Sequence, residues 1–430
     1  MTAFVRSWLV MASVALLTNW CGAQAPQFEG FAPGRSARYN AGYQPSYLDT
    51  GIEDELLPGD RSPWAQFDQQ LALTFKDIVA DSWVRVEYLN ASFQRPGNTL
   101  LGAPLVNVPN PRQPFAVAVG AVADPFNRAI VLDTSPLELR AQNGVRTSFG
   151  LNSFRDFSIE ASYVGVQEMR SGFQRVPINP GLDPDTVPGS VSFFGTSLLS
   201  DGVPGSSVIL YDRLFEVDYR AQYWSGEVNV LIQDHTPKLG LHVRPLFGFR
   251  FNSYGEDMVQ HGTFDNSSGV DPLLGILTTP HRNTILSTSQ NTMYMGQVGF
   301  QAELVDKWFT IGVAPKLAVG TNSVRTHLLT EDLRDSAIDI LANDGTTSET
   351  KRFTTIGANL DLNAFLRIRV NHWLSLTGSA YYWYMPNIVR SHDIIVYDDL
   401  GITDPPALHL KTKTNPIGIQ GFTVGAEITF

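Results

Sequence analysis

The chain has 430 residues, enough for two or three globular domains or for one large single-domain barrel. Only 17% of the residues are charged and the mean hydropathy is −0.07, which excludes both extended disorder and a membrane protein built from many apolar helices. The net charge of −11 argues against a nucleic-acid partner, and the single cysteine excludes a disulfide framework or a cysteine-based metal site.

Residues 1–23 have the composition of a signal peptide. Arg6 supplies the positive charge, residues 8–17 supply an apolar stretch, and small residues follow. Cleavage after Ala23 is expected, with a second possible position after Ala25. The chain is therefore predicted to be exported.

Residues 24–80 are rich in proline and glycine and cannot form a core alone, so they predict an N-terminal extension or a plug. Residues 81–430 show period-two alternation of apolar and polar side chains, which is typical of β-strands. The candidate strands are 82–90, 144–151, 156–165, 215–223, 228–232, 241–252, 294–304, 309–319, 360–370, 374–384 and 422–430. The apolar positions change parity after residues 224–226, which predicts a bulge or a tight turn there.

Several of these strands are longer than the usual five or six residues and reach the about nine to eleven that a tilted strand needs to cross a membrane. Alternation alone also fits a soluble β-sandwich. The export signal and the last strand favour the membrane, because that strand is amphipathic, ends on phenylalanine and resembles the C-terminal assembly signal of bacterial outer-membrane barrels. Its apolar positions are Phe422, Val424, Ala426, Ile428 and Phe430.

Aromatic residues near strand ends suit the two membrane interfaces; they are Trp308, Trp373, Trp383, Tyr384 and Tyr254. The sequence thus predicts an all-β fold: a single transmembrane antiparallel β-barrel of about twelve strands, within a range of about ten to fourteen, in a bacterial outer membrane. Long outer loops are predicted at residues 92–143, 166–207, 253–288, 321–352 and 391–420.

Short motifs carry a family resemblance. They are residues 83–89, 226–229, 246–251, 290–299, 316–320 and 382–390. Together these motifs resemble the planctomycete family of outer-membrane β-barrel porins. The resemblance implies a barrel fold and an outer-membrane location; residues 391–420 depart from the typical ending of that family.

Charged and polar residues opposite the apolar positions are the candidate lining of a pore. They are Arg85, Glu87, Arg146, Glu160, Glu216, Asp218, Arg220, Glu227, His242, Arg244, Arg250, Gln301, Glu303, Lys316, Asp361, Arg367, Arg369 and Glu427. The two signs are balanced, which predicts no strong ion selectivity. Opposed charges could filter solutes across a water-filled lumen, or they could pair with each other and fill a narrow barrel.

No catalytic motif is found. The histidines are scattered, and the sequence contains no His-Glu-x-x-His pair, Gly-x-Ser-x-Gly elbow or phosphate loop. Two acidic stretches, residues 265–271 and 398–404, fit solvated loop carboxylates better than a calcium site. We therefore expect no enzyme activity, no metal and no cofactor.

The predicted function is passive diffusion of small hydrophilic solutes through an outer-membrane barrel. The expected partners are membrane lipid, the barrel-assembly machinery and the solutes, with no nucleic acid. One alternative is a non-conducting barrel with a structural or adhesive role. Another is an exported soluble β-sandwich that binds carbohydrate. The sequence does not indicate an oligomeric state.

Overall fold

The structure is a computed structural model. It describes residues 82–119, 122–152, 156–180, 182, 186–233, 240–266, 276, 277, 279–333, 345–399 and 408–430. These residues all belong to one compact unit, Phe67–Phe430. The predicted signal peptide (1–23) and N-terminal extension (24–80) lie outside the described residues. No helix among the described residues is long and apolar enough to span a membrane.

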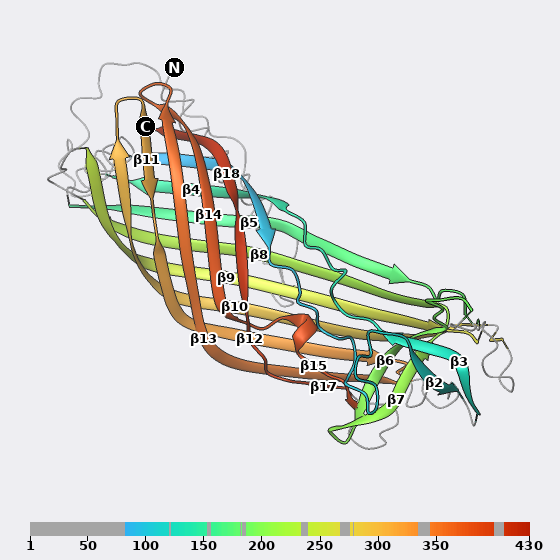
Figure 1. Ribbon diagram of the computed structural model, residues 1–430. Helices are drawn as coiled ribbons and strands as arrows, with labels where there is room; N and C mark the ends of the chain where they lie inside the picture. The colour runs from blue at the N-terminus through green and yellow to red at the C-terminus, as the bar shows by residue number, and fades with distance from the viewer. Residues whose placement is uncertain are drawn as a thin grey trace, which may run out of the picture. The chain divides into compact units, whose positions relative to one another are not determined.

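One large antiparallel sheet dominates the fold (Figure 1). Its strands are β1 (Ser82–Phe93), β4 (Gln142–Leu151), β5 (Phe157–Arg175), β8 (Leu214–Ile232), β9 (Leu241–Phe264), β10 (His281–Val305), β11 (Phe309–Val313), β12 (Lys316–Glu331), β13 (Thr346–Arg369), β14 (Leu374–Ile388) and β18 (Asn415–Thr429). The all-β, antiparallel prediction is confirmed. The sheet contains eleven strands, where about twelve were predicted.

The strand pairings return to their starting point. They run in the order β10-β12-β13-β14-β18-β1-β4-β5-β8-β9, and β9 pairs in turn with β10 over its whole length. The last strand, β18, pairs with the first, β1, from Trp83↔Thr429 onward. Strands β11 and β12 share one position, since both pair with β10 and β13, and Pro315 between them has no N–H to continue the ladder.

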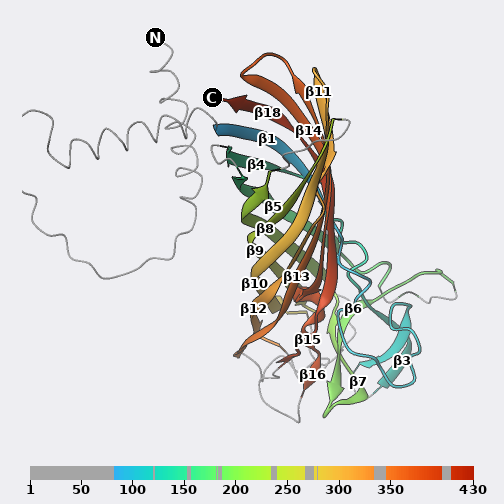
Figure 2. The same ribbon diagram turned by 90° about the vertical axis from the view of Figure 1, so that its left-hand side faces the viewer.

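A smaller sheet is built from the long connections. It contains β2 (Phe115–Val119), β3 (Val122–Val131), β6 (Phe193–Ser200), β7 (Val203–Tyr211) and β16 (Asp398–Asp399), while β15 (Ile395–Val396) pairs with β17 (His409–Leu410). Figure 2 shows the smaller sheet at the lower right, beside one end of the large sheet. Its core includes Phe193 and Leu210, which pack with Phe264 from the end of β9.

The two ends of the large sheet differ in their connections. At the turn end, the strands are joined across residues 152–156, 233–240, 306–308 and 370–373. At the loop end, the connections are 94–141, 176–213, 265–280, 332–345 and 389–414. Each connection at the loop end overlaps a predicted outer loop, but 176–213 runs past the predicted end at 207 and 389–414 begins before the predicted start at 391. The strands nevertheless extend well into the predicted loops. Strand β9 continues to Phe264, within the predicted loop 253–288, and β13 begins at Thr346, within the predicted loop 321–352.

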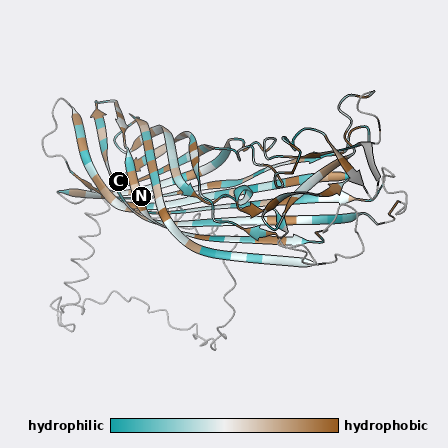
Figure 3. Ribbon diagram, turned by 60° about the horizontal axis from the view of Figure 1, so that its bottom comes forward, coloured by the Kyte–Doolittle hydropathy of each residue, from teal (hydrophilic) through white to brown (hydrophobic). Residues whose placement is uncertain are grey.

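The hydropathy pattern inverts along single strands; Figure 3 shows how hydrophilic and hydrophobic residues alternate along them. On β8, Phe215, Val217 and Tyr219 are buried at the loop end, whereas the buried residues on the same face at the turn end include Glu227. The pairing of β8 with β9 is continuous through residues 224–226, so the predicted bulge in β8 is wrong. The parity change instead records this inversion, and the bulge lies in β5, after Val166.

An aromatic core fills the loop-end half of the sheet. Tyr223 packs against Trp383 with ring centroids 5.5 Å apart and against Phe93 at 6.2 Å. Phe93 also stacks on Tyr254 at 6.3 Å. Trp383 and Tyr254, predicted to lie at a membrane interface, are therefore core residues of this half. We call the face of the sheet that carries them the inner face.

Candidate functional site

Large apolar side chains cover the outer face of the turn-end half. On β9, Val243, Phe247 and Phe249 are 43–50% exposed, and Val228 on β8 is 51% exposed. Similar residues on the other strands of this half are Val86, Phe149, Val298, Leu304, Ile311, Val319, Leu362, Ile368, Leu376 and Val424. A continuous apolar surface of this kind marks a contact with lipid or with another protein.

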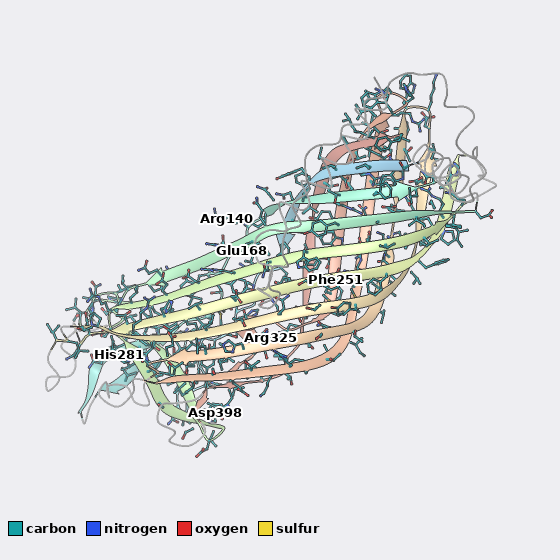
Figure 4. The ribbon with its side chains drawn as sticks, turned by 180° about the vertical axis from the view of Figure 1, so that it is seen from behind. Arg140, Glu168, Phe251, His281, Arg325 and Asp398 are labelled. Carbon is teal, nitrogen blue, oxygen red and sulfur yellow. The ribbon has the colours of Figure 1, made fainter. Side chains whose placement is uncertain are left out.

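Aromatic rings border this apolar surface on the loop-end side. Trp224 on β8 lies 4.6 Å from Phe251 on β9, which lies 5.1 Å from Tyr294 on β10, and Tyr163 on β5 lies 6.5 Å from Trp224 (ring centroids). We call these four residues the aromatic row; Phe251 is labelled in Figure 4. Aromatic girdles in this position are typical of the interfaces of membrane barrels.

The carboxylate of Glu227 is the centre of a buried polar network on the inner face. It accepts hydrogen bonds from the guanidinium of Arg250 on β9 and from the ammonium of Lys316 on β12, the latter at 2.6 Å. The guanidinium of Arg146 on β4 lies 4.0 Å away, and Arg250 also pairs with Asp361 on β13 at 2.5 Å. All five side chains are buried. Because these strands are not all neighbours in the sheet, the network crosses the space that the inner face encloses.

A second carboxylate, that of Glu87 on β1, extends this network. It accepts hydrogen bonds from the hydroxyl groups of Thr423 at 2.9 Å and Thr377 at 3.3 Å, and lies 3.8 Å from Arg146. Three more pairs on the same face are Arg85–Glu427 at 2.5 Å, Arg367–Glu427 at 3.2 Å and Arg244–Glu303 at 2.8 Å. The charges thus pair with one another across the interior.

The space beside these networks is small. One cavity, lined by Arg85, Glu87 and Arg367 among others, has a volume of about 10 Å³. Another of about 10 Å³ is lined by Arg146 and Glu227 among others. A cavity of this volume holds about one water molecule. Neither of these two cavities, at the level of the networks, has room for a solute larger than water.

Residues 389–397, which we call the inner segment, fold into the loop-end half. Arg390 donates a hydrogen bond to the buried carboxylate of Glu256 on β9 at 2.8 Å, and the backbone N–H of Ser391 donates to the same carboxylate at 2.9 Å. The side chain of Asn291 on β10 bonds both the N–H and the carbonyl of Val389. One of the predicted outer loops thus turns inward.

Asp393, in the short helical turn η1 (Ser391–Asp393), anchors the outer part of the inner segment. Burial acts to raise the pKa of its carboxyl, but the hydrogen bond and charge of His392 and the ammonium of Lys413 outweigh burial. The pKa of Asp393 therefore lies well below its ordinary value. Lys413 Nζ is 3.2 Å from the carboxylate, and Thr99 donates a hydrogen bond to it at 3.1 Å.

Most of the predicted lining residues share the inner face. They are Arg85, Glu87, Arg146, Glu160, Glu227, His242, Arg244, Arg250, Gln301, Glu303, Lys316, Asp361, Arg367 and Glu427. Glu216, Asp218 and Arg220 instead lie on the outer face, because β8 has inverted its pattern there and turns apolar residues inward. Arg369 is exposed at the turn end, where it donates to the carbonyl of Lys307.

The predicted assembly residues Phe422, Val424, Ala426 and Ile428 lie on the outer face of β18, and the backbone N–H of Phe430 donates to Ser82. Their role in assembly stays a prediction.

Sequence reasoning missed several contributors to the interior. Asn229, Ser162 and Gln297 join the network around Glu227, and neutral side chains gave no charge signal. In the sequence, Glu256 falls in a predicted loop and Arg390 in a family motif. No signal in the sequence indicates that these two residues form an ion pair. Among the described residues, no group of three or more His, Cys, Asp or Glu side chains could hold a metal ion. Residues 267–271 and 400–404 of the acidic stretches lie outside the described residues.

Several solved structures are similar to the chain. The outer-membrane protease OmpT of Escherichia coli is 11% identical, with a TM-score of 0.41, over 82% of this chain and 97% of its own. A FadL homologue of Pseudomonas aeruginosa is 11% identical, with a TM-score of 0.25, over 81% and 90%. The attachment invasion locus protein Ail of Yersinia pestis is 8% identical, with a TM-score of 0.23, over 81% and 99%. No curated protein matches the chain. The model of one protein family, described as putative beta barrel porin-7, matches residues 83–430.

Proposed function

We propose that this chain, which belongs to the putative beta barrel porin-7 family, is an outer-membrane barrel whose interior is closed to solutes in the described conformation. Its role is then structural or adhesive: the turn-end half anchors it in the membrane, and the loop-end half projects from the surface. The observation that carries this proposal is the paired network around Glu227, which crosses the interior where a pore would have to run.

The outer face supports the membrane placement. The apolar surface extends on β9 from Leu241 to Phe251, which matches the about nine to eleven residues that a tilted strand needs to cross the hydrocarbon core. The cyclic strand pairing leaves no unpaired edge in lipid, as a membrane barrel requires. Membrane lipid and the barrel-assembly machinery are the partners that this placement implies.

Passive diffusion of small hydrophilic solutes is the second candidate, and the porin name of the family favours it. Diffusion needs a water-filled path. Both the inner segment at the loop end and the Glu227 network below it would have to move to open one. Neither function includes a chemical step, so we propose no enzyme activity. A soluble β-sandwich needs two facing sheets, whereas most strands here belong to one sheet.

Single-channel recording separates the two candidates. The full chain, refolded in detergent and checked for heat-modifiable migration, is expected to give no conductance steps in a planar bilayer. The double variant Glu256→Ala, Arg390→Ala removes the buried pair that holds the inner segment without leaving a lone charge. It should also stay silent, because the Glu227 network closes the membrane half by itself. Stable steps from the unaltered chain would overturn the closed barrel and support diffusion.

A further inference from the structure

The outer face of β10, β12 and β13 changes character in register rows beyond the aromatic row. Tyr294 pairs with Thr321, which pairs with Ile356, at the level of the aromatic row. Two residues closer to the loop end, the row consists of the hydroxyl side chains Thr292, Ser323 and Thr354. The following row consists of Gln290, Arg325 and Arg352. Over these three rows the surface passes from mainly apolar side chains to hydroxyl groups and then to two arginines.

Arg325 and Arg352 are direct cross-strand neighbours, and both are exposed (Arg325 is labelled in Figure 4). Like charges directly opposite each other on a sheet are destabilising. Among the described residues, no carboxylate lies within 4 Å of either guanidinium, and the first acidic residue on the outer face of this panel is Glu331, three rows away. The described surface therefore presents two positive charges without a counter-charge.

Another panel of the same sheet is built differently. Arg220 on β8 is paired in register with Asp257 on β9, and its guanidinium lies 4.0 Å from the carboxylate of Glu168 on β5. Arg170 lies 2.7 Å from the same carboxylate. Arginines on this panel are neutralised by acids of the chain, so an unneutralised pair is not a general property of the outer face.

We propose that Arg325 and Arg352 bind the phosphate group of a membrane lipid. This inference rests on the membrane placement proposed above, but not on the closed interior. From Ile356 to Arg352 the strand rises about 13 Å, which at a tilt of about 45° is about 9 Å along the membrane normal. A long arginine side chain can reach back over that distance to the headgroup level.

The chemistry of the pair suits a phosphate. Guanidinium groups bind phosphate oxygens through two parallel N–H donors, and two of them can share one phosphate. Phosphate also removes the repulsion between the two arginines. The hydroxyl groups of Ser323 and Thr354 lie between the pair and the apolar surface, where they can donate to an ester oxygen. The apolar surface below would hold the acyl chains, which free phosphate lacks.

Native mass spectrometry of the full chain released from detergent micelles tests the site, with phosphatidic acid and phosphatidylcholine as competing probes. The unaltered chain is expected to retain phosphatidic acid in about tenfold preference, as a charge-assisted contact of this kind allows. The double variant Arg325→Gln, Arg352→Gln should lose that preference. Arg220→Gln, which removes an outer-face arginine that already has acidic neighbours, should keep it.

Several results would overturn the proposal: no preference in the unaltered chain, an unchanged preference in the double variant, or displacement of the lipid by an equal concentration of inorganic phosphate. Heat-modifiable migration of each variant shows that it is folded. If the double variant does not fold, the single variant Arg352→Gln replaces it in the test, because this substitution relieves the repulsion between the two arginines. Conductance of the unaltered chain would refute the closed interior without affecting this result, whereas solubility without detergent would remove the membrane placement itself.

Discussion

The turn-end and loop-end halves of the large sheet are made from the same long strands but are built for different surroundings. On β8, the inner face carries Glu227 in the turn-end half and Tyr219 in the loop-end half. The outer face changes in the opposite direction, from Val228 to Asp218. The change occurs at the aromatic row, on strands whose hydrogen bonds continue without a break to β9.

This difference shows what water requires of the loop-end half and what lipid requires of the turn-end half. In the loop-end half, water outside and an apolar core inside resemble a soluble protein, so burial of aromatic rings stabilises it. In the turn-end half, an apolar outer face in lipid gains little from burial, and the interior has to hold polar groups that satisfy each other. Continuous strands couple the two halves, as the proposed membrane anchor and projecting half require.

The largest expected effect comes from Glu227→Gln in the turn-end half. The substitution leaves the buried Arg250 and Lys316 with one carboxylate fewer, and within the described residues Lys316 has no other ion-pair partner. Breaking a buried pair in this way costs about 3–5 kcal/mol. The free energy of unfolding in urea, followed by the change in gel migration, measures it. Asp218→Asn, at an exposed position on the same strand, should change it by less than about 0.5 kcal/mol. Equal effects would contradict the network.

A second substitution tests where lipid begins. Val228→Arg places a charge on the outer face at membrane level and should cost about 2–4 kcal/mol in lipid bilayers. Gln222→Arg lies on the same face of the same strand, beyond Trp224 of the aromatic row, and should be nearly neutral. Comparable losses at both positions would remove the boundary between the two halves.

Sequence alone could predict the turn-end half in detail. Alternation from Leu241 to Phe251 placed Phe249 outside and Arg250 inside, and both lie there. The prediction worked because a strand with lipid on one face and polar groups on the other has a strong period-two signal. The charge pairing itself could not be predicted, since it depends on which strands face each other, as Arg250 and Asp361 do.

The predictions for the loop-end half are wrong for a definable physical reason. Period-two alternation does not say which face is inside, so Glu216, Asp218 and Arg220 were assigned to the lumen by extending the rule that holds nearer the turn end. The parity change at residues 224–226 is the available signal, although the same change also fits a bulge. In a strand that leaves the membrane, such a change marks the boundary instead. The inner segment gave no local signal, because Arg390 and Glu256 are brought together only by the fold.

The smallest expected effect is the acid sensitivity of the inner segment in the loop-end half. The pKa of Asp393 is lowered in the folded chain, so its contribution to stability is present above the ordinary value of about 3.9 and is lost as the pH falls from there toward the folded pKa. Hydrogen exchange of residues 391–393, corrected for the intrinsic rate, should therefore lose protection between about pH 4 and lower values. In Asp393→Asn this loss should be weaker, which separates it from titration of Glu256 nearby. Exchange on β9 between Leu246 and Phe249, in the other half, should change less over the same range, because these residues are paired on both sides with β8 and β10. An identical acid profile in the variant and the unaltered chain would show that Asp393 does not hold the segment.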